Sequence, residues 1–120
     1  MIESSAILNM IIALGLVSEN ERNQILSFCE SIGEQMTSRL KSEEHATSAV
    51  VITACAAIAF YNYLLVNSQE DFFSFKAGDV TVKQNYEARV ENATKFKNEC
   101  LVSAAPYLTD ISFVFEAVEV

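Results

Sequence analysis

The sequence predicts a mostly α, α+β protein: a four-helix core with a β-hairpin at about residues 72–83 and a candidate C-terminal strand. Apolar residues recur every three or four positions over most of the chain, and alternate with period two only in two short stretches. The chain has 120 residues, of which 51% are hydrophobic, with three Gly and one Pro. This composition predicts a single helical domain over residues 1–120 with an inserted hairpin and little room for long loops.

The first 40 residues predict two helices. Residues 4–16 are apolar nearly all round, and Gly15 predicts the end of this helix. Ser18 and Glu21 have the spacing of a capping box, which predicts the start of the second helix. Four- and three-residue spacings then place one apolar stripe along it, made of Ile25, Cys29, Ile32, Met36 and Leu40.

Two longer helices are predicted in the rest of the chain. The helix at about residues 43–67 is apolar on every side, so other helices or a neighbouring subunit must surround it. The fourth runs from about Asn85 to Ala105, where Pro106 ends it. Lys95 and Lys97 are expected to turn toward water. The apolar stripe of this helix consists of Tyr86, Val90, Ala93, Phe96, Cys100 and Ala104.

The stretch "DFFSFKAGDVTVKQ" changes to period two, which is typical of strands joined by a tight turn. An isolated hairpin is marginally stable in water, so it needs a packing surface or a third strand. The C-terminal run, with Ile111, Phe113 and Phe115 alternating, is the candidate third strand. Pairing within one chain or between chains remains open. We expect an interface at Phe73, Phe75, Gly78, Asp79, Val80 and Val82, although a hairpin packed on its own core is equally expected.

Charge and hydropathy exclude several classes of function. Acidic residues outnumber basic ones by 16 to 8, giving a net charge of −8, and no basic cluster is present to bind phosphates. Sequence-specific nucleic-acid binding and attachment to an anionic membrane are therefore not expected. Residues 46–66 carry no charge and could span a bilayer by length. Their flanks are acidic rather than basic, which favours a buried central helix and no membrane partner.

No catalytic constellation is found in the sequence. His45 is the one histidine and lies in a charged helix start, which predicts a surface residue. Cys29, Cys55 and Cys100 are widely spaced, which predicts buried thiols in a reducing cytoplasm rather than metal ligands. The motifs of phosphate-binding loops and of serine nucleophiles are absent. We therefore expect a non-enzymatic protein without catalytic residues, metal or cofactor.

The central part of the chain resembles a known family. Residues 74–83, "SFKAGDVTVK", follow an Ala-rich helix ending in "AFYNYLL" and precede a further helix and an aromatic C-terminal run. Over residues 46–120 this arrangement resembles the small head–tail connector, or head-completion adaptor, proteins of phages and prophages. The resemblance implies a mostly helical subunit that forms a homo-oligomeric ring beneath the portal and contacts portal and tail proteins. An acidic lumen would suit such a ring because it repels DNA phosphates.

The expected function is thus a structural role in a virion, with the protein located in the virion or in the cytoplasm of a bacterial host. The alternative is a small cytoplasmic regulatory or ligand-binding helical module. Its apolar pocket would lie between the helices near Tyr61 and Tyr63, with Phe60 beside them.

Overall fold

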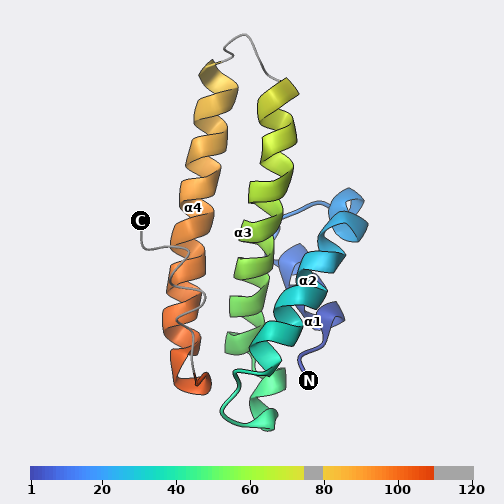
Figure 1. Cartoon of the computed structure of the whole chain (residues 1–120), viewed down its shortest axis with the longest axis vertical. Coiled ribbons are helices and arrows are strands. Elements are labelled where there is room, and N and C mark those ends of the chain that lie inside the picture. Colours follow the sequence, from blue (N-terminus) through green and yellow to red (C-terminus); the bar gives the residue numbers. More distant parts are fainter. Residues whose placement is uncertain (75–79, 110–120) are drawn as a thin grey trace.

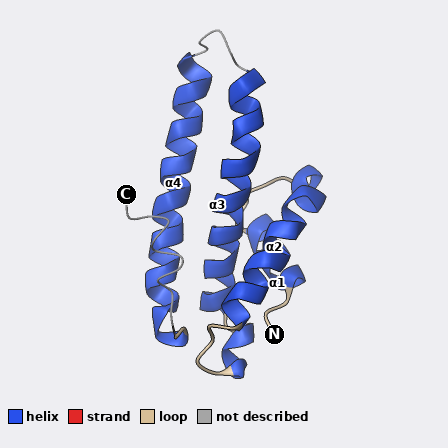
Figure 2. Cartoon of the chain, viewed as in Figure 1, coloured by secondary structure: helices blue, strands red, loops and turns tan. Residues whose placement is uncertain are grey.

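The computed structural model describes the backbone of residues 1–74 and 80–109, and the side chains of these residues outside 67–86. Its helices are α1 (Ser4–Ala13), α2 (Arg22–Thr37), α3 (Ala49–Ser74) and α4 (Val80–Ala104). Short 3-10 helices occupy Glu19–Glu21, Glu43–Thr47 and Ala105–Tyr107 (Figure 2). The predicted mostly helical character and the four helices are confirmed.

Helix α3 is the centre of the fold. It lies between α4 on one side and the α1/α2 pair on the other, and α3 and α4 run antiparallel past the end of α1 and α2 (Figure 1). The molecule is elongated, with principal extents of 51 × 32 × 19 Å. Helix α4 packs mainly against α3 and the short helix that follows it, so α3 is its main helical neighbour.

The end of α1 follows from Gly15, as predicted. Gly15 has φ +71°, a left-handed conformation that costs glycine little because it has no Cβ. Its N–H donates to the Ile12 carbonyl at 3.0 Å, and the Leu16 N–H donates to the Ile11 carbonyl at 3.2 Å. These two bonds form a Schellman motif, which satisfies carbonyls that a helix end otherwise leaves unpaired.

The predicted capping box and stripe of α2 are also present. Glu21 accepts a hydrogen bond from the Ser18 N–H at 3.2 Å, completing the box before the helix begins. The four stripe residues inside α2 are buried: Ile25, Cys29, Ile32 and Met36. Leu40 lies beyond the helix, where it forms an isolated antiparallel bridge with Leu108.

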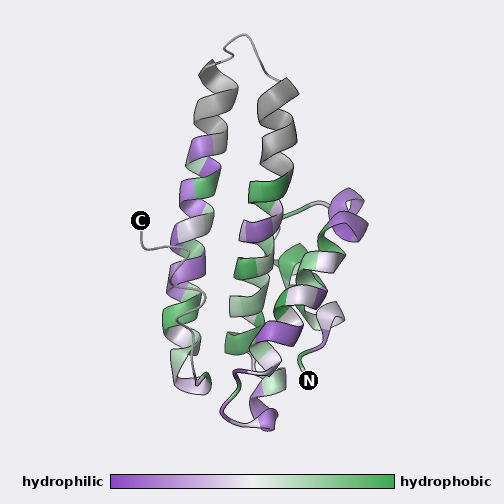
Figure 3. Cartoon of the chain, viewed as in Figure 1, coloured by the Kyte–Doolittle hydropathy of each residue, from purple (hydrophilic) through white to green (hydrophobic). Residues whose placement is uncertain are grey.

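The core is concentrated on the first half of α3, where Figure 3 shows mostly apolar residues. All residues from Ala54 to Phe60 are buried, and the four alanines among them allow close approach of neighbouring helices. By length and composition alone, Ala49–Val66 would pass as a membrane span. Core helices of soluble proteins have the same length and composition, and 56% of this stretch is buried within the protein.

The hairpin over residues 72–83 is not confirmed. Residues 72–74 lie in α3 and residues 80–83 in α4, while 75–79 fall outside the described residues. Extending a helix that already exists adds a backbone hydrogen bond per residue without a new nucleus, whereas a lone two-stranded ribbon is marginal. The described residues contain no strand, and the candidate C-terminal strand lies in residues 110–120, outside them.

The α4 stripe differs from its prediction. Ala93 and Ala104 are buried as expected, but Phe96 and Cys100 are only half-buried. The side chain predicted to face water, Lys97, is 2% exposed and belongs to the buried face. Its ammonium lies 3.9 Å from the centre of the Tyr61 ring, so an aromatic face replaces part of its hydration.

The chain after α4 returns to the end of α2. The Lys41 N–H donates to the Tyr107 carbonyl at 3.0 Å, and the Thr109 N–H donates to the Arg39 carbonyl at 2.7 Å. The Thr109 hydroxyl donates to the same carbonyl at 3.1 Å. These bonds fix the point from which residues 110–120 leave the described fold.

Candidate functional site

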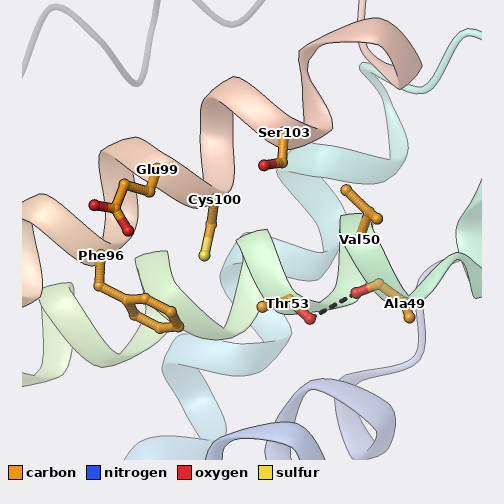
Figure 4. A pocket seen from close by; sticks show the side chains of 7 residues that line it. All are labelled: Ala49, Val50, Thr53, Phe96, Glu99, Cys100 and Ser103. Carbon is orange, nitrogen blue, oxygen red and sulfur yellow. Dashed lines mark hydrogen bonds between the residues drawn. The ribbon is translucent and has the colours of Figure 1, made fainter.

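The candidate site is an open groove between the first turns of α3 and the last turns of α4 (Figure 4). Its volume is about 370 Å³, within the range of small-ligand sites. We call it the α3/α4 groove and define it by its lining residues: Ala49, Val50, Thr53, Phe96, Glu99, Cys100 and Ser103.

Side chains of α4 give the groove its chemical character. In Figure 4 the Cys100 thiol points toward α3, with Phe96 and Val50 on either side of it along the groove. Thr53 presents little polarity because its hydroxyl already donates to the Ala49 carbonyl at 2.6 Å. Glu99 is exposed at the edge. The surface is therefore apolar at its floor and acidic at one rim.

An exposed valine lies on α4 outside the groove. Val102 is 68% exposed, whereas Val50 within the groove is 36% exposed. Val102 follows Cys100 by two positions, about 200° around a helix of 3.6 residues per turn, so it faces away from the groove and is one of the single exposed hydrophobic residues that are ordinary on a surface. We call Val50, Phe96 and Cys100 together the α4 flank.

The opposite side of α3 has a closed polar network. The Tyr63 hydroxyl donates to Glu21 Oε2 at 2.7 Å, and Gln24 Oε1 lies 3.0 Å from the same hydroxyl. Phe28 packs edge-on against the Tyr63 ring, with centroids 5.8 Å apart. The hydrogen bond from Tyr63, followed by those from Ser18, lowers the pKa of Glu21 despite partial burial. This network anchors α2 to α3.

The pocket expected near Tyr61 and Tyr63 is not the groove found here. Tyr63 is buried and hydrogen-bonded to α2, and Tyr61 lies under Lys97. Phe60 is buried as well, with the Arg89 guanidinium 5.8 Å from the centre of its ring. The α3/α4 groove is lined by none of these three aromatic residues.

Two buried polar groups distinguish the α4 side. The described ion pairs are Arg22–Glu19 and Lys95–Glu91, and Lys97 belongs to neither. Burial lowers the pKa of Lys97, because desolvation disfavours the charged ammonium. Asn98 Oδ1 is buried and accepts no hydrogen bond from the described part of the chain. Unsatisfied buried polar groups are destabilising, so the α4 side of α3 contains buried polar groups whose desolvation is not fully compensated.

The three thiols differ in accessibility. Cys29 and Cys55 are fully buried, and desolvation raises their pKa values to about 11 and about 12. Burial also raises the pKa of Cys100, which is half-buried and lines the groove. The thiolate is the reactive form of cysteine, so none of the three is an activated nucleophile. Cys100 is the thiol that solvent reaches.

The other residues singled out in the sequence form no reactive centre. His45 packs edge-on against Tyr107, with ring centroids 4.8 Å apart, at the end of the molecule where the chain returns to α2. Among the described residues, no cluster of three His, Cys, Asp or Glu side chains could hold a metal ion. The titratable residues that line the groove are Glu99, which is exposed at its edge, and Cys100.

Three of the predicted interface residues are described, and they lie at the far end of the α3/α4 pair from the groove. Phe73 falls within α3, and Val80 and Val82 fall within α4. Phe75, Gly78 and Asp79 lie outside the described residues. The sequence did not predict the groove, although Phe96 and Cys100 were placed on the inner face of α4. Because Lys97 belongs to the buried face of α4, Phe96 and Cys100 lie at the edge of that face and form a wall of the groove.

Comparison of the chain with protein-family models, with curated proteins and with solved structures gives no match.

Proposed function

We propose that this protein is a non-enzymatic structural subunit that assembles with copies of itself through the α4 flank. Within that class we propose the role of a head–tail connector or adaptor of a phage or prophage, assembling as a ring. The observation that carries the proposal is the contrast around α3. One side is closed by two helices and a hydrogen-bonded network, while the other is covered by α4 and leaves an apolar groove open.

The physical argument is one of incomplete burial. A half-buried Phe96 and the partly exposed Val50 gain free energy if another surface removes them from water, by about 25 cal/mol per Å² of apolar area. A head-to-tail contact between copies closes into a ring when its rotation permits. The net charge of −8 favours a lumen that repels DNA.

Solution mass tests self-assembly directly. We expect light scattering of the purified full chain to give a discrete oligomer that persists on dilution, with rings in negative-stain images. Val50→Asp should lower the mass, because it places a charge on the flank at a groove position that is 36% exposed. Leu14→Asp, at an exposed position on the far side of α3, is the matched control. A monomer at every concentration would contradict self-assembly.

The segment over residues 72–83 remains a second proposed contact. If this segment contacts another copy, Phe75→Asp should lower the oligomer mass as Val50→Asp does. If the groove end of the molecule alone forms the contact, Phe75→Asp should leave the mass unchanged. The two variants together locate the interface at one end of the α3/α4 pair or at both.

The virion role has its own test. Portal, capsid and tail genes adjoining the gene for this chain would support the connector role. A metabolic or regulatory operon would contradict it, and would favour the ligand-binding module instead. The groove supports that second candidate, because its volume of about 370 Å³ suits a small apolar molecule. A thermal-shift screen of small apolar compounds would then identify the ligand class.

A further inference from the structure

We propose that the α3/α4 groove is the docking site of the chain's own C-terminal segment, residues 110–120, which covers the groove in the free subunit. The inference deepens the proposed function, because it names what regulates the assembly surface. Docking of the segment does not require self-assembly. Only the regulatory consequence rests on the proposed function, since another copy would have to displace the segment to reach the groove.

The first argument is where the chain leaves the described fold. Ser103, which lines the groove, lies one residue before the end of α4, and the short helix Ala105–Tyr107 follows directly. Thr109 is then held on the Arg39 carbonyl by its N–H and its hydroxyl. The segment therefore starts at the same end of the α3/α4 pair as the groove.

The second argument is length. Eleven residues span at most about 36 Å when extended, at about 3.3 Å per residue. From Phe96 to Ser103 the groove follows two turns of α4, a rise of about 10 Å at 1.5 Å per residue. A tether of this length has ample reach to return to its own groove. It holds the segment at a millimolar effective concentration, which favours the chain's own segment over that of a second copy.

The third argument is chemical complementarity. In the sequence "ISFVFEAVEV", Ile111, Phe113 and Phe115 recur at every second position, so an extended segment presents them on one face. The groove offers Phe96, Val50 and the Cys100 thiol as an apolar surface for such a face. The alternation also supplies a control position, since Val114 would face away from the groove in the same extended segment.

The native thiols supply the reporter. Cys100 lines the groove, whereas Cys29 and Cys55 are fully buried. A maleimide reagent at pH 8, with labelled sites counted by mass spectrometry, should therefore report groove access through Cys100. Labelling at Cys29 or Cys55 would reveal a variant that has failed to fold, and Cys100→Ser should abolish the signal.

We expect Phe113→Asp in the full chain to raise the Cys100 labelling rate at least about tenfold, since a shift of that size needs only about 1.4 kcal/mol. Val114→Asp, with the same charge change on the other face, should leave the rate within about twofold. Equal rates in the unaltered chain, Phe113→Asp and Phe115→Asp would overturn the proposal.

A dilution series distinguishes docking of the chain's own segment from docking of a second copy's segment. If the segment docks within one chain, protection of Cys100 should not depend on protein concentration. Protection that is lost on dilution would overturn the inference and place a second copy's segment in the groove. The proposed function is tested separately by solution mass. A protein that is monomeric by light scattering would contradict self-assembly, while protection of Cys100 that depends on Phe113 would still support docking of the segment.

Discussion

The two sides of α3 differ in how fully their apolar groups are buried and their polar groups are hydrogen-bonded. Toward α1 and α2, the buried residues are apolar, and the Tyr63 hydroxyl donates a hydrogen bond to Glu21 at 2.7 Å. Toward α4, a lysine is buried without a described ion pair, an amide oxygen is unsatisfied, and a groove remains open. The first side has the features of a stability core, and the second has those of a surface that retains binding capacity.

The largest expected effect tests the packed side against the open one. Ile25→Ala removes a fully buried side chain from the α2–α3 interface and should lower the free energy of unfolding by about 3 kcal/mol. Phe96→Ala removes a larger but half-buried side chain from the groove wall and should cost only about 1 kcal/mol. Urea denaturation of both variants gives the comparison. Equal costs would show that α4 is packed as tightly as α2.

A medium effect is expected from the polar network. Tyr63→Phe removes the hydroxyl bound to Glu21 and should cost about 1 kcal/mol at pH 7 for this partly exposed pair. The folded-state pKa of Glu21 is lowered below its ordinary 4.5, so its contribution is present above pH 4.5 and is lost as pH falls through the folded value. The cost of Tyr63→Phe should therefore shrink in acid. A cost independent of pH from 3 to 7 would argue against a charged partner.

The smallest expected effect has the opposite sign. Lys97→Met removes a buried ammonium and should stabilise the protein by about 0.5 kcal/mol at pH 7, since the lost contact with the Tyr61 ring offsets part of the gain. The folded pKa of Lys97 is lowered, so the unaltered protein gains stability as pH rises from that value to 10.5. The advantage of Lys97→Met should shrink over that window.

Lys95→Met is the control for Lys97→Met. Lys95 is exposed and paired with Glu91 at 3.6 Å, an arrangement that contributes little. It should change the free energy of unfolding by no more than a few tenths of a kcal/mol. Destabilisation by Lys97→Met, with no effect of Lys95→Met, would mean that the ammonium has a stabilising partner.

The sequence predicted the α1/α2 side closely because its signals are local. The capping box at Ser18, the left-handed Gly15 and the stripe from Ile25 to Met36 are each decided within a few residues, and the structure confirms all of them. Helices with caps and one clear apolar stripe are predictable from such short-range patterns.

The α4 side was predicted less well because its outcome depends on contacts distant in sequence. Lys97 looked like a surface residue, and only the Tyr61 ring on α3, 36 positions earlier, explains its burial. The groove arises from that same rotation of α4, so no local motif marks it. At residues 72–74 and 80–83 the alternating pattern was outweighed by continuation of two long helices. The connector role, the homo-oligomer and the C-terminal strand remain predictions.

The position of α3 at the centre has a consequence for synthesis on the ribosome. Its Ala-rich half is complete before the 30 residues from 75 to 104, which carry α4, have been made. At about 5–20 residues per second, that interval lasts roughly 1.5 to 6 s. During that interval, α1 and α2 can fold onto one side of α3, while the side that α4 will cover stays exposed to solvent. A nascent chain stalled after residue 74 would expose its most apolar helix, so the yield of soluble protein should depend on prompt translation of α4.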